Sequence, residues 1–128
     1  MRPILFQSIH RNMLQTVLRD INNTFIGHSR TFVQDNSAHL ACIEISPHFR
    51  HLGFGSQLLN ETEQSIRTHF QVSQIKLLAW LPDGSDIVVD FYKRNGFLVS
   101  NHTSMVYDDY THVYDLVQMY KPLSTPSK

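Results

Sequence analysis

The residues whose spacing most clearly suggests chemistry lie around position 50. Arg50, Gly53 and Gly55 form the pattern Arg-x-x-Gly-x-Gly, which follows an alternating apolar run at residues 43–45 and a proline. An amphipathic stretch begins directly afterwards. Glycine lets a ligand approach the main chain closely, and the N–H groups at the start of a helix bind phosphate. The pattern predicts a strand, a turn and a helix N-terminus that could hold a phosphate group. The alternative is a tight strand-to-helix turn that binds nothing.

Length and composition limit the classes of protein that fit. The chain has 128 residues, and its 11 basic side chains balance its 11 acidic ones, which argues against binding to nucleic-acid phosphates. No apolar run approaches the roughly 20 residues of a membrane helix, and no secretory signal pattern opens the sequence. The single cysteine, Cys42, cannot form an internal disulfide and suits a reducing compartment. We expect one cytoplasmic domain over residues 1–128, with no nucleic-acid or membrane partner.

Apolar periodicity predicts the elements that must position the glycine loop. Spacing typical of a helix occurs at residues 10–21, 53–69 and about 85–94, and the last of these ends at Asn95-Gly96. Strand patterns cover residues 2–9, 24–33, 38–45, 75–81, 97–107 and 112–121. Strict alternation in the strand at 38–45 places His39, Ala41, Ile43 and Ile45 on one face. The order predicts an α/β or α+β sheet with helices on its faces. Residues 122–128 read as a loose tail.

A second segment agrees with the first. Phe91-Tyr92-x-x-x-Gly96-Phe97 lies about 35 residues beyond Ile45-x-Pro47-x-x-Arg50-x-x-Gly53-x-Gly55-x-x-Leu58-Leu59 and follows a buried strand. Together the two segments closely resemble the Gcn5-related N-acetyltransferase (GNAT) superfamily, over roughly residues 24–123. The resemblance implies a GNAT-like mixed, mostly antiparallel central sheet with helices on both faces. The N-terminal part, residues 1–23, is shorter than in relatives.

The resemblance implies acetyl-coenzyme A (acetyl-CoA) as the co-substrate. The main chain of the incoming strand would pair with the pantetheine arm, and the N–H groups of the loop would hold the pyrophosphate, which suits a helix N-terminus. Arg50 would add a permanent positive charge beside that anion, or be a solvated surface arginine. The implied cofactor-binding residues are Ile43, Glu44, Ile45, Arg50, His51, Leu52, Gly53, Phe54, Gly55, Ser56, Ser85 and Tyr92.

The family's reaction is direct attack of a neutral amine on the thioester carbonyl in a ternary complex. By position, Tyr92 matches the acid that protonates the thiolate, and its alternative role is packing beside Phe91. His39 matches a strand-borne base, and its alternative is a half-buried sheet histidine. Glu44 is a rival base, which strict alternation puts on the opposite face unless the strand bulges.

Two departures from the family pattern bear on function. Ser85 stands where many relatives carry an asparagine that contacts the cofactor, so that contact is in doubt. The short N-terminal region leaves the acceptor pocket either open or completed by a second subunit in a homodimer. The acceptor would be a primary amine of a small molecule or of a protein or peptide. A rival hypothesis is a regulatory module that binds acetyl-CoA and acts on a partner protein without chemistry.

The eight histidines do not predict a metal site. His48 and His51 flank Arg50, but no His-x-x-x-His or Cys-x-x-Cys spacing occurs. We therefore expect no metal cofactor.

Overall fold

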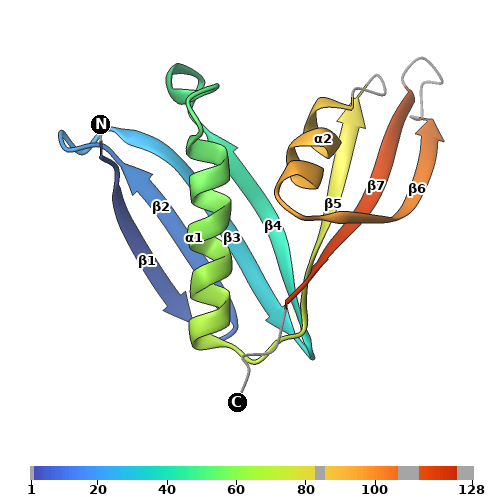
Figure 1. The fold of residues 1–128 in the computed structure, drawn as a ribbon, viewed down its shortest axis with the longest axis horizontal. Coiled ribbons are helices and arrows are strands. Elements are labelled where there is room, and N and C mark those ends of the chain that lie inside the picture. The colour runs from blue at the N-terminus through green and yellow to red at the C-terminus, as the bar shows by residue number, and fades with distance from the viewer. Residues whose placement is uncertain (1, 83–85, 107–112, 124–128) are drawn as a thin grey trace. The chain divides into compact units, whose positions relative to one another are not determined.

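The computed structural model describes residues 2–82, 86–106 and 113–123. The chain divides into two compact units, residues 1–72 and 73–128. Unit 1 has four strands in the order β1-β2-β3-β4 and one helix (Figure 1). They are β1 (Ile4–His10), β2 (Met13–Arg19), β3 (Phe25–Gln34), β4 (Ser37–Ile45) and α1 (Phe54–His69).

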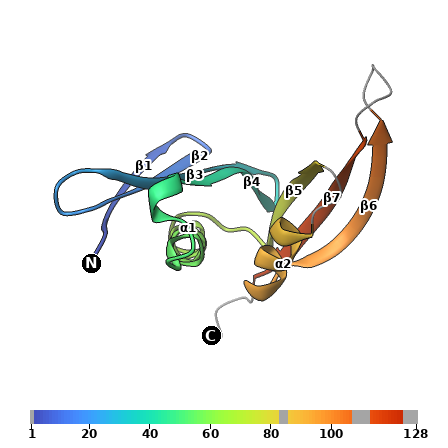
Figure 2. The same ribbon diagram turned by 90° about the horizontal axis from the view of Figure 1, so that it is seen from above.

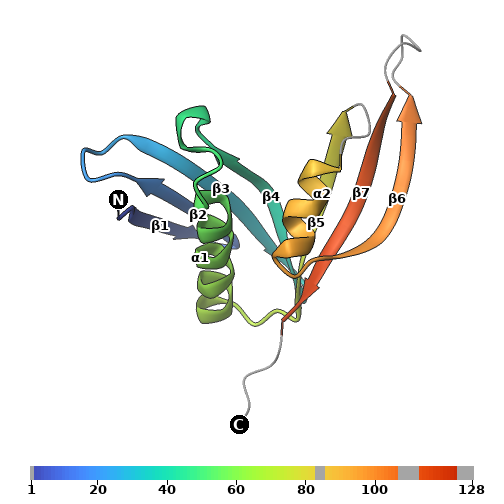
Figure 3. The same ribbon diagram turned by 45° about the horizontal axis from the view of Figure 1, so that its top comes forward.

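The described part of unit 2 has three strands in the order β5-β7-β6 and a short helix beside β5 (Figure 3). They are β5 (Gln74–Pro82), α2 (Ile87–Arg94), β6 (Leu98–Val106) and β7 (Val113–Pro122). The strand pairs described within both units are antiparallel. The predicted mixed class, with mostly antiparallel strands and helices, is confirmed. No helix in the described part of the chain is long and apolar enough to cross a bilayer.

The single domain over residues 1–128 and the loose tail from residue 122 stay predictions. Leu123 is buried, and its N–H donates to the Ser73 carbonyl at 2.8 Å. Residues 124–128 lie outside the described part of the chain.

The helix predicted over residues 10–21 is wrong, because this segment forms the turn and second strand of a hairpin. Arg11, with a φ of 56°, makes the turn between β1 and β2. Leu14, Thr16 and Leu18 are buried while the residues between them are half-buried. Positions 14 and 18 fit an i, i+4 helical repeat and also the period of two in a strand. Apolar spacing alone therefore could not separate the two structures.

Helix α1 covers one face of the unit 1 sheet, as Figure 2 shows in end view. Its predicted apolar face is confirmed, since Leu58, Leu59, Thr62 and Ile66 are buried. Phe54 and Leu58 pack in a core cluster with Leu18 and Ile26. No helix of the described part of unit 1 lies over the opposite face.

A β-bulge at Ala41 changes which residues of β4 face α1. Cys42 pairs with Arg30 and Leu40 pairs with Thr31, so Ala41 is an extra residue. Before the bulge Ala38 and Leu40 are buried, and after it Ile43 and Ile45 pack against the core. The predicted common face for His39, Ala41, Ile43 and Ile45 is therefore wrong, because strict alternation does not continue through a bulge.

A buried hydroxyl chain joins α1 to the sheet. Thr62 Oγ1 donates to the Leu58 carbonyl at 2.8 Å and lies 2.6 Å from Ser29 Oγ. Because the Thr62 proton is committed to Leu58, Ser29 must be the donor in the second bond. Thr16 and Thr31 are also fully buried, but their hydroxyls have no hydrogen-bond partner among the described residues.

We predict that Thr62→Val lowers the free energy of unfolding by about 1–3 kcal/mol, because it leaves the Ser29 hydroxyl buried without its acceptor. Thr31→Val is the matched control, since the hydroxyl it removes has no such bond. It should leave stability unchanged or slightly higher. Urea unfolding of both variants checks this, and equal losses would contradict the hydroxyl chain.

Candidate functional site

The loop between β4 and α1 is held by main-chain hydrogen bonds. The N–H of Ser46 donates to the Ile26 carbonyl at 2.7 Å, and the N–H of Phe49 donates to the Ser46 carbonyl at 2.9 Å. The second of these bonds spans a 3₁₀ turn, η1 (Pro47–Phe49), whose N-cap is Ser46. The end of β4 and the start of the loop are thereby fixed to β3.

Two residues with positive φ turn the chain into α1. His51 has a φ of 63° and Gly53, the N-cap residue, a φ of 84°. A Cβ at Gly53 would meet nothing within 4 Å, so the backbone angle and not space favours glycine there. The first bond of the helix runs from the Gln57 N–H to the Gly53 carbonyl at 3.1 Å. The N–H groups of Phe54 and Gly55 precede it and have no partner inside the helix, as an anion site requires.

The predicted pyrophosphate residues are mostly exposed in this loop. The exposed residues are His51, Leu52, Gly53 and Ser56, and Gly55 is half-buried. The Phe54 side chain is buried in the core, so only the main-chain N–H of Phe54 is available to a ligand. The exposed Arg50 side chain donates from Nε to the Ile45 carbonyl at 3.1 Å. That bond anchors the guanidinium at the start of the loop, and its terminal nitrogens bond to none of the described residues.

A glycine that the sequence analysis missed brings β3 close to the predicted pantetheine strand. Gly27 pairs with Ile45, and a Cβ built on it would lie 2.5 Å from the Glu44 carbonyl oxygen. Any larger residue would push β4 away at Glu44 and Ile45. The available signal was a glycine inside an otherwise regular strand pattern, which often marks a close backbone approach.

The bulge at Ala41 places both candidate bases on the sheet face opposite α1. Glu44 pairs with His28 across the strands, and His28 Nε2 lies 3.3 Å from Glu44 Oε2. The Glu44 side chain is 72% exposed, while that of His28 is 21% exposed. His39 pairs with Phe32 and is half-buried. At about 3.3 Å per residue, His39 and Glu44 are on the order of 15 Å apart, so one proton cannot be within reach of both.

Tyr92 lies in the last turn of α2, in unit 2, and is 8% exposed. The Phe97 N–H donates to the Tyr92 carbonyl at 3.0 Å, and the Gly96 N–H donates to the Lys93 carbonyl at 3.0 Å. With Gly96 at a φ of 93°, this is a Schellman motif. The rings of Tyr92 and Phe97 lie 5.5 Å apart. The Phe-Tyr-x-x-x-Gly-Phe segment is therefore a helix stop that fixes the tyrosine in place.

Ser85 lies outside the described residues. The first described residue after that gap, Asp86, is the N-cap of α2 and makes no side-chain capping bond. The glycine loop and Glu44 belong to unit 1, and Tyr92 belongs to unit 2.

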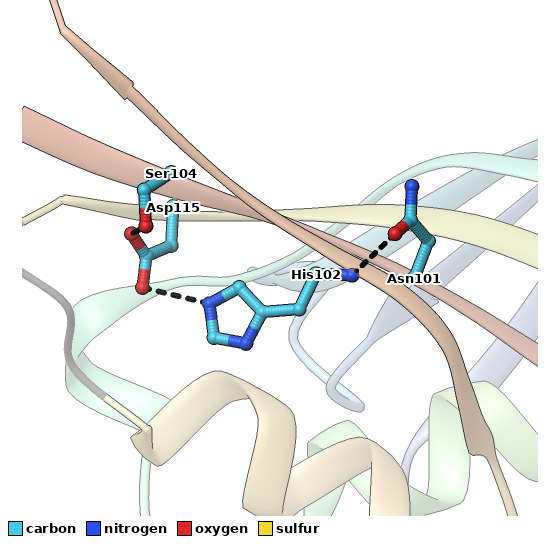
Figure 4. A network of polar contacts seen from close by, with 4 residues as sticks. All are labelled: Asn101, His102, Ser104 and Asp115. Carbon is cyan, nitrogen blue, oxygen red and sulfur yellow. Dashed lines mark hydrogen bonds and ion pairs between the residues drawn. The ribbon is translucent and has the colours of Figure 1, made fainter.

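Unit 2 also carries a polar cluster that the sequence analysis missed. Asp115 on β7 accepts two bonds from β6: His102 Nε2 lies 2.8 Å from Oδ2, and Ser104 Oγ donates to Oδ1 at 2.9 Å (Figure 4). These hydrogen bonds, His102 first, lower the pKa of Asp115 from its ordinary value of 3.8. His102 and Ser104 are alternate residues of one strand, which was the available signal for a shared face.

We predict that Ser104→Ala raises the pKa of Asp115 toward its ordinary value. A carboxyl whose pKa is lower in the folded than in the unfolded state stabilises the fold at pH values above its unfolded-state pKa. This stabilisation is lost as the pH falls through the folded-state pKa. The variant should therefore lose stability at neutral pH, and this loss should shrink in acid. Ser100→Ala is the matched control on the same strand, because its hydroxyl donates to the Gln118 carbonyl, which does not titrate. Unfolding at several pH values checks this, and parallel curves for both variants would contradict it.

The sequence profile described as the acetyltransferase (GNAT) family matches residues 2–97. No curated protein matches the sequence.

Solved acetyltransferase structures share the fold. The ribosomal-protein-S18-alanine N-acetyltransferase from Escherichia coli is 18% identical with a TM-score of 0.76, over 94% of this chain and 75% of that one. The spermidine/spermine N-acetyltransferase SpeG from Vibrio cholerae is 21% identical with a TM-score of 0.73, over 88% and 67%. A Bacillus anthracis protein assigned as a streptothricin acetyltransferase, solved with acetyl-CoA, is 16% identical with a TM-score of 0.75, over 95% and 85%.

Proposed function

Because the chain belongs to the acetyltransferase (GNAT) family, we propose that it transfers an acetyl group from acetyl-CoA to a primary amine. The observation that carries this proposal is the loop at the start of α1. Its positive-φ residues, His51 and Gly53, present exposed main chain at a helix N-terminus, and Arg50 is held beside it. Such a group of donors suits a phosphate or diphosphate.

Acetyl-CoA binding would use both the loop and the incoming strand. The N–H groups of residues 51–56 would bind the pyrophosphate, and Arg50 would add a charge-assisted bond. The main chain of residues 43–45 would pair with the two amides of the pantetheine arm, as an added strand does. Gly27 supports this role, because its close approach fixes the position of Glu44 and Ile45 from the β3 side.

The chemistry we propose is direct attack by the amine in a ternary complex. The amine nitrogen bonds to the thioester carbonyl carbon, the carbon–sulfur bond breaks, and the thiolate takes a proton from the Tyr92 phenol. An unperturbed phenol has a pKa of about 10 and a thiol a pKa of about 8.5, so this proton transfer is uphill by only about 2 kcal/mol, which a positioned acid can supply. The Schellman motif that holds Tyr92 supports such a positioned acid.

The base that removes the proton from the attacking nitrogen would come from β4. Glu44 is exposed beside the proposed pantetheine segment and is oriented by His28, whereas His39 lies several residues further along the strand. Both remain candidates, directly or through water. Comparing Glu44→Gln with His39→Gln distinguishes them, since only the variant that lacks the base should lose turnover.

The acceptor is proposed only as a class. The names of the structural neighbours give as acceptors spermidine or spermine, an alanine of ribosomal protein S18, and streptothricin. These span small molecules and proteins, so we propose a primary amine of either kind. In place of an N-terminal helix, unit 1 has the β1–β2 hairpin, and the pocket would be open or completed by a second subunit.

The experiment that tests the function follows free thiol as acetyl-CoA is mixed with the protein and a panel of amines. The panel contains spermidine, a peptide with an N-terminal alanine, and streptothricin, and acetyl-CoA without amine is the control. We expect thiol release that depends on at least one amine. Calorimetric binding of acetyl-CoA without release would indicate the regulatory binding module instead, and absence of both would overturn the proposal.

We predict that Tyr92→Phe lowers kcat by about 10²-fold and leaves the Kd for acetyl-CoA unchanged, because only the proton donor is removed. Tyr120→Phe is the matched control, since Tyr120 is a half-buried tyrosine on β7 in the same unit. Steady-state kinetics and calorimetry check the pair. An unchanged kcat in Tyr92→Phe would exclude the tyrosine as the acid.

A further inference from the structure

Strand β1 lies at the outer edge of the unit 1 sheet, and among the described residues it pairs only with β2 (Figure 1). All of its residues except Leu5 are exposed. Three of the exposed side chains are large and apolar: Ile4 is 44% exposed, Phe6 is 48% exposed and Ile9 is 42% exposed. The unpaired N–H and C=O groups of an edge strand are a template on which another strand can pair.

The features that usually prevent edge strands from pairing are missing from β1. Its register against β2 runs without a bulge over all seven residues. The strand contains no lysine and no acidic residue, its one titratable side chain is that of His10, and Pro3 lies just before it. Charges, prolines and bulges are the features with which natural sheets block their edges. The edge of unit 1 can therefore accept another strand.

The hydrogen bonds of the hairpin show which main-chain groups of β1 point to this edge. Successive residues of a strand direct their N–H and C=O groups to opposite sides. The Asn12 carbonyl accepts from the Val33 N–H of β3 at 2.8 Å, so Met13 bonds in the other direction, toward its β1 partner His10. Every second residue of β1, counted back from His10, therefore bonds to β2. The residues that direct their main-chain groups away from β2 are Leu5, Gln7 and Ile9.

A second copy of β1 is complementary to this edge. Two identical strands pair antiparallel about a two-fold axis, and the register centred on Gln7 uses the full length of both strands. Gln7 then lies opposite Gln7 of the second copy, and Leu5 lies opposite Ile9. The outward main-chain groups would form about six hydrogen bonds, two for each of these pairs. No like charges face each other in this register, because His10 lies opposite Ile4.

Side chains on both sheet faces support the same register. On the face that α1 covers, Leu5 packs against the core cluster of unit 1, and Ile9 of the second copy would extend this apolar layer. On the opposite face, Phe6 would lie diagonally across from Phe6 of the second copy, within reach of an aromatic contact. Two joined edges of this length bury a small interface, which is typical of weak and reversible complexes.

We propose that this protein forms a weak two-fold dimer through antiparallel pairing of β1, which joins the unit 1 sheets of two chains into one sheet. Each copy uses its own edge to cover that of the other, so the assembly closes at two chains. The inference goes beyond the proposed function and does not depend on acetyl transfer.

The first test measures mass by analytical ultracentrifugation of the whole chain, from about 1 μM to about 1 mM. We expect a monomer–dimer equilibrium in which Gln7→Pro raises the dimer Kd by about 30-fold, the loss expected for two main-chain hydrogen bonds. Proline removes the N–H that points to the edge in each copy and leaves the bonds to β2 in place. Gln7→Thr is the matched control, because it keeps this N–H and suits a strand, and it should dimerise as the wild type does.

The second test uses the charge variants Gln7→Lys and Gln7→Glu to examine the register. Each variant alone places two like charges opposite each other at the two-fold axis, so its dimer should be weaker than that of the wild type. An equimolar mixture should form a mixed dimer whose Kd is about tenfold lower than that of either variant alone. A variant that failed to fold could not produce this recovery.

A wild-type chain that stays monomeric up to about 1 mM would overturn the proposal. A dimer whose Kd is unchanged in Gln7→Pro would place the interface away from β1 and overturn it as well. Charge variants that do not recover when they are mixed would exclude the register centred on Gln7. Species larger than a dimer would indicate that β1 pairs with a different edge, which also contradicts a closed two-fold assembly.

Discussion

The extra residue at Ala41 in β4 is the constraint on which much of unit 1 depends. Before it, the residues that face α1 are Ala38 and Leu40, and after it they are Ile43 and Ile45. One inserted residue lets the same strand keep apolar contacts with the core over its whole length. It also gathers His39 and Glu44 on the other face, where no helix of the described part of unit 1 covers them. The bulge thus separates the part of β4 that supports the fold from the groups that could do chemistry.

Backbone conformation, more than side-chain identity, shapes the candidate site. The loop that enters α1 requires positive φ at His51 and Gly53, and α2 ends through positive φ at Gly96. The first turn exposes main-chain donors, and the second fixes Tyr92 through the bond from Phe97. Gly27 contributes in a different way, because the space for its missing side chain is occupied by β4. Gly53 and Gly96 lie in the two short and distant segments that carry the family resemblance.

The sequence predicted elements well where a pattern had only one structural solution. The dense apolar run of β5, the long amphipathic α1 and the two-residue turn at Asp35-Asn36 are each of this kind. The N-terminal hairpin was missed because Leu14 and Leu18 satisfy both a helical and a strand period. A bulge in β4 was an open alternative, but its position could not be predicted because one inserted residue leaves no compositional sign. The Asp115 cluster depends on the register of β6 against β7, which a list of residues cannot supply.

The two units differ in how far apart in the sequence their paired strands lie, which affects when each strand can pair during synthesis. In unit 1 each strand pairs with its neighbour in sequence, so pairing closes only short loops and costs little entropy. In unit 2 the partner of β5 is β7, and α2 and β6 intervene. During synthesis the apolar residues of β5 would therefore emerge before the strand that pairs with them in unit 2 has been made. Until residues 113–122 are complete, the apolar β5 therefore lacks its partner in unit 2 and is exposed to misassociation.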